Sequence, residues 1–263
     1  MSLRLEGVSY RYAGSTATVL SGVDLVVERG EVVGLVGANE AGKTTLCLVA
    51  AGLAPATIGG RLVGTVHIDD LSTAVARPFE LAQRCGTLFQ NPATQLSGTA
   101  PTVWEEIAFG PRNLALPLAE VVARVEEAVR LLAIGDLVRR DPARLSGGQA
   151  QLIALAGVLA LRPSYLILDE PTSQLDPQGT RLVGDALAAL AAHANVGVLI
   201  VEHKTDLLAG LASRVAVIEA GRLVAGGPAA DTLADERLPG WGVQPPAPVR
   251  LARAAAAAGV SLG

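Results

Sequence analysis

Several features that define other protein classes are scarce in this sequence. Cysteine occurs twice, as Cys47 and Cys85, which is too few for a disulfide framework and fits a reducing compartment. The longest uninterrupted apolar run, Leu152 to Leu161, has ten residues and is too short to cross a bilayer. No basic-then-apolar leader opens the chain. These absences predict a protein made in the cytoplasm that has no membrane span of its own.

Basic residues are not in excess either. The chain has 21 Lys and Arg against 25 Asp and Glu, which gives a net charge of −4 and a pI near 5.4. Surfaces that bind nucleic acid usually carry surplus Lys and Arg, so we expect no nucleic-acid partner. Mean hydropathy is +0.42, from Ala, Val and Leu spread along the chain, and this favours exposed apolar surface for a protein partner.

The most informative motif lies between Val33 and Leu46, where an apolar strand runs into a glycine-rich loop and then into a helix. The loop has the pattern of a P-loop, whose amides and helix N-terminus bind phosphates. In such a loop the lysine reaches the β- and γ-phosphates and the threonine hydroxyl binds Mg²⁺. The predicted nucleotide-binding residues are Gly37, Asn39, Gly42, Lys43, Thr44 and Thr45, and the predicted cofactors are ATP and Mg²⁺.

A second motif, Leu145-Ser-Gly-Gly-Gln149, stands about a hundred residues later and opens a predicted helix. Alone, Ser-Gly-Gly before a helix is most often an ordinary N-terminal cap. Glycines and a free hydroxyl at a helix N-terminus can also approach an anion closely. The P-loop in the same chain favours the second interpretation, which makes Ser146, Gly147, Gly148 and Gln149 nucleotide-binding candidates.

With these two motifs the sequence resembles the ABC-type ATPases. The segment Tyr165-Leu-Ile-Leu-Asp169-Glu170 is similar to the Walker B strand of that family. The resemblance implies that Asp169 binds Mg²⁺ and that Glu170 is the catalytic carboxylate acting on the attacking water. It also implies that Ser173 and Asp176, in the following D-loop (Ser173–Asp176), contact nucleotide.

Three further positions match the family. His203 ends the apolar segment GVLIVEH and corresponds to the switch histidine at the γ-phosphate, so it joins Glu170 and Lys43 as a catalytic candidate. Gln90 matches the Q-loop glutamine and joins Thr44 and Asp169 as a metal candidate. Tyr12 aligns with the aromatic residue that stacks on adenine, and Tyr10 is the alternative.

The order of elements predicts an α/β fold. Short, β-branched segments come first (LRLEGVSY, VDLVVE, EVVGLVG and GTVHID), and we expect them to form an N-terminal antiparallel β-subdomain. Residues of about 93–160 show helical spacing, where the resemblance places an inserted helical subdomain. Strand and helix then alternate, which requires a mostly parallel sheet around the P-loop. We therefore predict an ABC ATPase domain over residues 1–227 and a Pro- and Ala-rich tail over 228–263.

The resemblance also implies how the site is completed. In ABC ATPases the LSGGQ segment of one subunit closes over ATP on the P-loop of another, in a head-to-tail pair. This chain carries both halves, so a homodimer and a heterodimer with a second ABC ATPase are equally compatible with the sequence. Gln174 in the D-loop would fit an asymmetric pair.

Within the family, Phe89-Gln-Asn-Pro-Ala-Thr-Gln95-Leu and Pro101-Thr-Val-Trp-Glu-Glu-Ile-Ala-Phe-Gly110-Pro are similar to the energy-coupling-factor ATPases. That resemblance implies a motor subunit at the cytoplasmic face of the membrane, with a transmembrane coupling protein and a substrate-capture membrane subunit as partners. It implies uptake of a micronutrient, a vitamin or a transition-metal ion. The alternatives are a soluble ABC ATPase outside transport and a nucleotide-binding scaffold that does not hydrolyse ATP.

Some positions depart from the family pattern. Glu40 stands where the P-loop usually has glycine, and we expect its side chain to point outward. Gln151-Leu152 replaces a basic residue after LSGGQ, and Lys204 replaces the aspartate after the switch histidine. We expect these changes to affect contacts between subunits rather than nucleotide chemistry.

Overall fold

The computed structural model describes residues 1–193 and 195–258 and contains two β-sheets. The antiparallel sheet has the order β2-β1-β4-β5, and its strands are β1 (Ser2–Arg11), β2 (Leu20–Glu28), β4 (Arg61–Ile68) and β5 (Leu71–Ser72). The other sheet has the order β10-β9-β3-β8-β7-β6. Its strands are β3 (Val32–Val36), β6 (Cys85–Leu88), β7 (Tyr165–Asp169), β8 (Gly197–Val201), β9 (Arg214–Glu219) and β10 (Arg222–Pro228). All of its pairings are parallel except β9 with β10.

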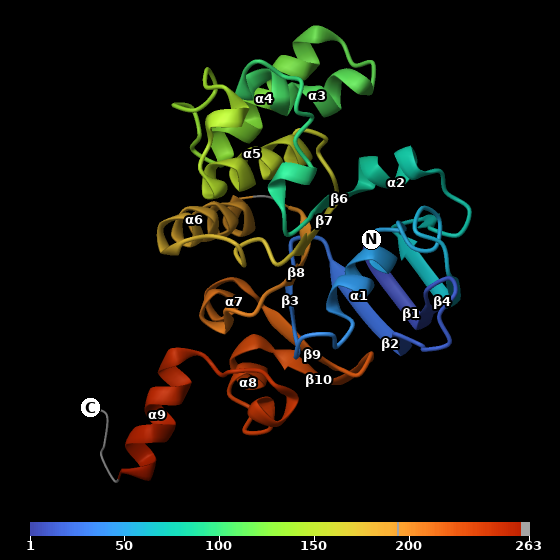
Figure 1. Ribbon diagram of the computed structural model, residues 1–263, viewed down its shortest axis with the longest axis vertical. Helices are drawn as coiled ribbons and strands as arrows, with labels where there is room; N and C mark the ends of the chain where they lie inside the picture. Colours follow the sequence, from blue (N-terminus) through green and yellow to red (C-terminus); the bar gives the residue numbers. More distant parts are fainter. Residues whose placement is uncertain (194, 259–263) are drawn as a thin grey trace.

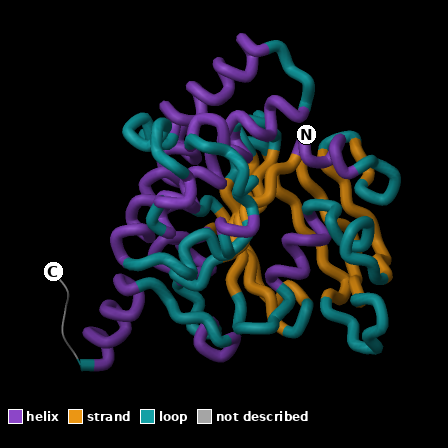
Figure 2. The backbone as a smooth tube through the Cα atoms, turned by 45° about the horizontal axis from the view of Figure 1, so that its top comes forward, coloured by secondary structure: helices purple, strands orange, loops and turns teal. Residues whose placement is uncertain are grey.

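Helices lie on both faces of this second sheet (Figures 1 and 2). The α-helices are α1 (Lys43–Ala50), α2 (Pro78–Arg84), α3 (Val103–Asn113), α4 (Leu118–Leu131), α5 (Gly147–Leu159), α6 (Pro177–His193), α7 (Thr205–Leu211), α8 (Ala229–Leu233) and α9 (Ala247–Ala257). Short 3-10 turns lie at Pro92–Thr94, Pro142–Arg144 and Leu238–Trp241. Helices α3, α4 and α5 pack on one another at one end of the molecule. The predicted α/β fold with an antiparallel N-terminal sheet and inserted helices is confirmed.

One strand assignment from the sequence is wrong. The segment EVVGLVG contains β3, which lies in the mostly parallel sheet between β8 and β9 and not in the antiparallel subdomain. All residues of β3 are buried, whereas β1 and β2 alternate between buried and exposed positions. Strands covered on both faces read as continuous apolar runs, which is the pattern of β3.

The parallel sheet separates two hydrophobic cores. In β3, Val33 and Leu35 face the core shared with α1 and the antiparallel sheet, while Val32 and Val36 face the core shared with the helical layer. Strand β7 divides its side chains in the same way. The carboxyl ends of the parallel strands are thereby held between two packed layers.

The C-terminal segment is part of this packing. Leu233, Leu238 and Val243 are buried in the core on the helical side. Helix α9 has no buried residue and extends away from the body (Figures 1 and 2).

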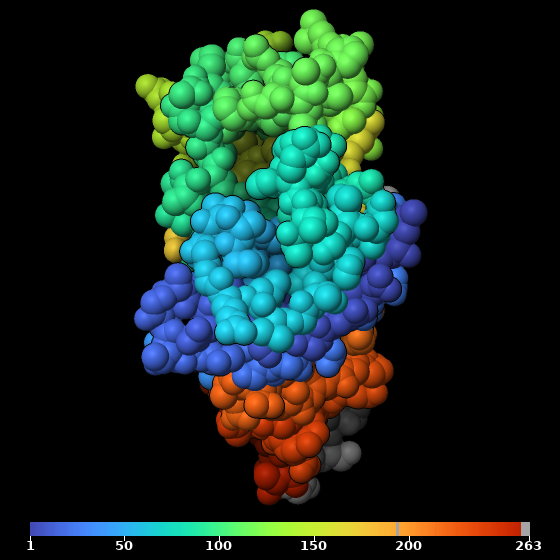
Figure 3. Space-filling view, turned by 90° about the vertical axis from the view of Figure 1, so that its right-hand side faces the viewer, coloured from blue at the N-terminus to red at the C-terminus, as the bar shows by residue number. Residues whose placement is uncertain are grey.

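In the space-filling view the helices α3–α5, the antiparallel sheet and the C-terminal elements follow one another along the long axis (Figure 3). Within residues 1–193 and 195–258, no helix is both long and apolar enough to span a membrane.

Candidate active site

The P-loop lies between β3 and α1, and two of its glycines are required by the geometry. A Cβ on Gly37 would lie 2.3 Å from the Ile218 carbonyl oxygen of the neighbouring strand. Gly42, at the start of α1, has φ of 105°, a conformation that residues with a side chain rarely adopt. No side chain in the described part of the chain caps this helix, so its first amide groups are available to an anion.

Lys43 is buried at the mouth of this loop. Its ammonium donates to the carbonyl oxygens of Gly37 at 3.0 Å and Ala38 at 2.8 Å. Burial lowers the pKa of Lys43, and the nearby carboxylates of Glu170 and Asp169 oppose that shift. A cation held this way is pre-positioned for the phosphates of a nucleotide.

A cavity of about 620 Å³ opens beside the loop. It is lined by Val19, Asn39, Glu40, Gly42, Lys43, Thr44, Thr45, Gln90, Glu170 and His203. The cavity therefore brings together the P-loop candidates other than Gly37 with the catalytic candidates Glu170 and His203 and the Q-loop glutamine, which come from four separate parts of the sequence.

Glu170 is the centre of the polar contacts in this cavity. One carboxylate oxygen lies 2.9 Å from His203 Nε2, and the other accepts a hydrogen bond from Gln90 Nε2 at 3.3 Å. Its backbone φ is 50°, which is uncommon for a residue with a side chain. The turn is stabilised by hydrogen bonds from the Glu170 amide to the Val201 carbonyl and from the Ser173 hydroxyl to the Glu170 carbonyl. A carboxylate placed between a histidine and an amide can orient a water molecule and accept its proton.

Asp169, at the end of β7, fits a Mg²⁺ ion. Its side chain is buried, and no residue within 1–193 and 195–258 forms a hydrogen bond with its Oδ1 atom. Burial raises the pKa of Asp169, and a hydrogen bond with Thr44 opposes this. A buried carboxylate oxygen without a donor, beside a threonine hydroxyl, is the hard-oxygen environment that Mg²⁺ prefers.

Of the two tyrosine candidates for adenine, only Tyr12 has an accessible ring. Tyr12 is half-buried, and its hydroxyl lies 2.9 Å from Thr45 Oγ1 on α1. Tyr10 is buried and its hydroxyl donates to the Gly59 carbonyl. The two rings meet edge to face at 5.0 Å, so Tyr10 supports the position of Tyr12.

The LSGGQ segment lies outside the P-loop cavity. Ser146 caps α5 by accepting from the Gln149 amide at 3.3 Å, and the Gln149 side chain accepts from the Ser146 amide at 3.1 Å. Ser146 and Gly147 are exposed, and Gly147 lines a separate cavity of about 470 Å³. Gly148 is buried, and a Cβ there would lie 2.7 Å from Gly179 Cα on α6.

The D-loop candidates make contacts within their own chain. Asp176 accepts from the Gly179 amide at 2.6 Å and so caps α6, while Ser173 bonds to Glu170 as described above. Both remain exposed.

Glu40 has φ of 64° and an exposed side chain at the rim of the P-loop cavity, which agrees with the expected outward orientation.

Two residues that position the site have no role assigned by the sequence. Gln95 accepts from the Phe89 amide at 2.7 Å and donates to the Thr87 carbonyl at 2.8 Å, which fixes the backbone before Gln90. Glu202 is 1% exposed and bonds to the loop after Glu170. A charged residue at the end of an all-apolar strand was the available signal for Glu202, because such a group requires hydrogen-bond partners.

Fold and site together define a P-loop ATPase whose phosphate-binding loop and LSGGQ segment face different cavities. Residues 20–173 match the family described as ABC transporter, and the chain belongs to this family of ATP-binding, ATP-hydrolysing domains.

The chain is similar over most of its length to proteins of other organisms. It is 40% identical over 236 residues to the nickel import ATP-binding protein NikO of Rhodobacter capsulatus, covering 89% of this chain and 91% of NikO. The structure of cbiO1 from Clostridium perfringens, described as part of the ABC transporter complex cbiONQ, matches with a TM-score of 0.79 and 30% identity. That match covers 89% of this chain and 91% of cbiO1. A longer protein from Methanosarcina mazei, a putative ABC transporter ATP-binding protein, is 39% identical to this chain. The match covers 95% of this chain and 42% of that protein.

Proposed function

We propose that this chain is the ATP-hydrolysing motor subunit of an energy-coupling-factor-type importer. Its ATPase dimer closes on ATP and reopens after hydrolysis, and this cycle drives uptake of a micronutrient through membrane partners. The observation that carries the proposal is the separation of the P-loop cavity from the LSGGQ segment, since one chain then holds two incomplete halves of a site. The similarity to NikO and cbiO1 supports the importer assignment.

In this proposal the residues of the P-loop cavity have distinct tasks. Lys43 and the free amides at the start of α1 bind the β- and γ-phosphates, and Tyr12 stacks on the adenine. Glu170 orients the attacking water and takes its proton, while His203 contacts the γ-phosphate. Asp169, Thr44 and Gln90 would hold Mg²⁺, which when bound neutralises phosphate charge.

The second half of the site comes from another subunit. Ser146, Gly147 and Gln149 present a helix N-terminus and a hydroxyl to the γ-phosphate bound on the partner's P-loop. Ser173 and Asp176 lie on the same side of the contact. The partner is a second copy of this chain or a related ATPase, and the pair docks on a transmembrane coupling protein at the cytoplasmic face of the membrane. A small membrane subunit captures the vitamin or transition-metal ion.

The test is co-purification from membranes of the native host. The tagged chain is extracted in mild detergent and its companions are identified by mass spectrometry, with the Glu170→Gln variant included to keep the ATP-bound pair closed. We expect a polytopic membrane protein, with a small membrane subunit that narrows the substrate class. Recovery of ribosomal or repair proteins without a polytopic membrane protein would contradict the importer assignment.

A further inference from the structure

The loop that carries His203 is hydrogen-bonded through Glu202 to Thr172, the residue directly before the D-loop. One carboxylate oxygen of Glu202 accepts from the Thr172 amide at 3.0 Å and from the Thr172 hydroxyl at 2.6 Å. The other accepts from the His203 amide at 3.1 Å. Glu202 is 1% exposed, and a buried carboxylate with three short donors is a stiff connection.

Lys204, on the other side of His203, connects to residues on both sides of the D-loop. Its ammonium donates to the Thr172 carbonyl at 2.9 Å and to the Thr180 hydroxyl at 2.7 Å. Thr172 directly precedes the D-loop, and Thr180 lies in the first turn of α6, which follows it. Four hydrogen bonds therefore join Glu202 and Lys204, on either side of His203, to Thr172 and Thr180, which flank the D-loop.

Lysine is rare in this chain, so a lysine at position 204 differs from the usual basic residue of the sequence. Lys43 and Lys204 are the two lysines in the sequence, and the other basic residues of the 21 are arginines. A compact ammonium donates in several directions to acceptors on different elements, whereas a guanidinium is a planar fork suited to carboxylates. The geometry at Lys204, with a carbonyl and a hydroxyl as acceptors, is the kind that an ammonium satisfies.

We propose that Glu202 and Lys204 are positioning residues that tie His203 to the D-loop. A γ-phosphate that draws His203 away from Glu170 then moves residues 202–204, and this motion passes through Thr172 and Thr180 to the D-loop segment that faces the second subunit. The inference rests on the proposed function for the role of the second subunit, but the connection itself lies within one chain.

The two lysines allow a direct test in the wild-type protein. Lysine labelled isotopically at the ε-carbon gives one NMR signal for Lys43 and one for Lys204, assigned with the Lys204→Arg variant. We expect ADP and a non-hydrolysable ATP analogue both to shift the Lys43 signal, and the analogue alone to shift the Lys204 signal. In His203→Ala the Lys204 shift should disappear while the Lys43 shift remains.

Each outcome of the labelling experiment has a meaning. A Lys204 signal that stays fixed while Lys43 responds to the analogue would overturn the connection, and so would a Lys204 shift that persists in His203→Ala. A Lys43 signal that responds to neither nucleotide would instead contradict nucleotide binding at the P-loop, and with it the proposed function.

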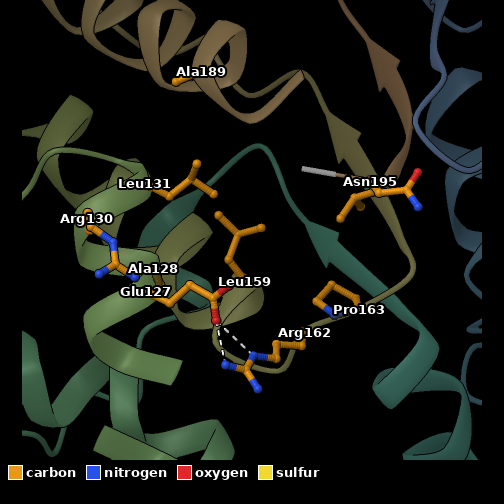
Figure 4. Close-up of a pocket in the computed structure, with 10 residues that line it drawn as sticks. Glu127, Ala128, Arg130, Leu131, Leu159, Arg162, Pro163, Ala189 and Asn195 are labelled. Carbon is orange, nitrogen blue, oxygen red and sulfur yellow. Dashed lines mark hydrogen bonds and ion pairs between the residues drawn. The ribbon is translucent and has the colours of Figure 1, made fainter. Parts of the chain in front are cut away.

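Kinetics give a second, independent readout. Lys204→Met should lower kcat about tenfold while the ATP Kd stays within about twofold, because the lost contacts act on the closed pair and not on the P-loop. The matched control is Arg162→Met, which removes a cation bonded to Glu127 at 2.6 Å and to Glu120 at 3.0 Å. Arg162 lies beside a cavity at the amino-terminal ends of β7 and β8, whereas the P-loop cavity lies at the carboxyl ends of the strands (Figure 4). Equal kcat values for the two variants would overturn the proposal.

Discussion

The two halves of the site differ in how much of their chemistry is built into one chain. The P-loop half holds a buried lysine, a buried carboxylate oxygen that receives no donor from the described part of the chain, and a glutamate already in contact with a histidine. The LSGGQ half holds a capped helix N-terminus whose Ser146 and Gly147 are exposed. The first half is preorganised because its groups sit at strand ends between two cores. In the proposed function the second half is a surface that acts only when it meets another subunit.

The largest expected effect tests the half that holds the catalytic groups. Glu170→Gln should lower the ATP hydrolysis rate about 100-fold or more, since an amide cannot accept the proton of the attacking water. ATP binding should persist, because Lys43 and the P-loop amides are unchanged. Steady-state hydrolysis and equilibrium nucleotide binding check the two parts. A hydrolysis rate equal to that of the wild type would favour the non-hydrolysing scaffold instead.

Complementation tests whether the two halves act across a pair. Lys43→Ala and Gly147→Asp should each abolish hydrolysis, and mixing the two variants should restore about a quarter of the wild-type rate, because half of the pairs are mixed and each has one intact site. Position 147 is suitable because, among the residues that the structure describes, a Cβ there meets only the Leu175 side chain, at an ordinary 3.5 Å. If the wild-type chain hydrolyses ATP by itself, activity that stays absent after mixing would contradict a site shared between two copies. A wild-type chain that is inactive by itself would point to a different ATPase as partner.

The adjacent glycines of the LSGGQ half should separate folding from function. Gly148→Ala should lower the free energy of unfolding by about 1–3 kcal/mol, because its Cβ must displace the backbone of α6 at Gly179. Gly147→Ala should leave the unfolding free energy nearly unchanged and lower hydrolysis in the assembled pair. Thermal unfolding of both variants provides the comparison, and equal melting temperatures would contradict the close packing of α5 on α6.

Variants at Tyr12 test the predicted adenine contact of the P-loop half. Tyr12→Ala should raise the KM for ATP about tenfold, given that stacking of a base on an aromatic ring contributes about 1–3 kcal/mol. Tyr12→Phe keeps the ring and loses the contact with Thr45, so its KM should stay within about threefold of the wild type. If both variants bind ATP like the wild type, the adenine does not stack on this ring.

The smallest effect is expected at Glu40. Glu40→Gly removes the cost of a positive φ, about 1–2 kcal/mol, and adds about 0.5–1 kcal/mol of backbone entropy cost, so stability should rise slightly or stay level. ATP affinity should change little, because the side chain is exposed. Calorimetric titration with ATP measures this directly. A marked loss of affinity would show that the carboxylate takes part in binding.

Much of the fold could be predicted from particular segments. The apolar runs ending in Asp169 and in His203 predicted buried parallel strands, and the helical spacing after Pro92 predicted the inserted helices, as observed. The assignment of β3 failed because a short apolar strand reads alike in either sheet, and only its neighbours β8 and β9 decide its place. The burial of Leu238 and Val243 in the core could not be predicted either, because both lie in a segment rich in proline.

The sequence by itself determined the chemistry that resides in contiguous residues. A P-loop, a strand ending in two carboxylates and a capped LSGGQ helix are local, because neighbouring backbone groups and side chains create them. Only the tertiary structure decided which groups meet across the chain: Glu202 with Thr172, Lys204 with Thr180, and Gly148 with Gly179. Such contacts join residues about 30 positions apart, and their distances depend on how sheets and helices pack rather than on any spacing along the sequence.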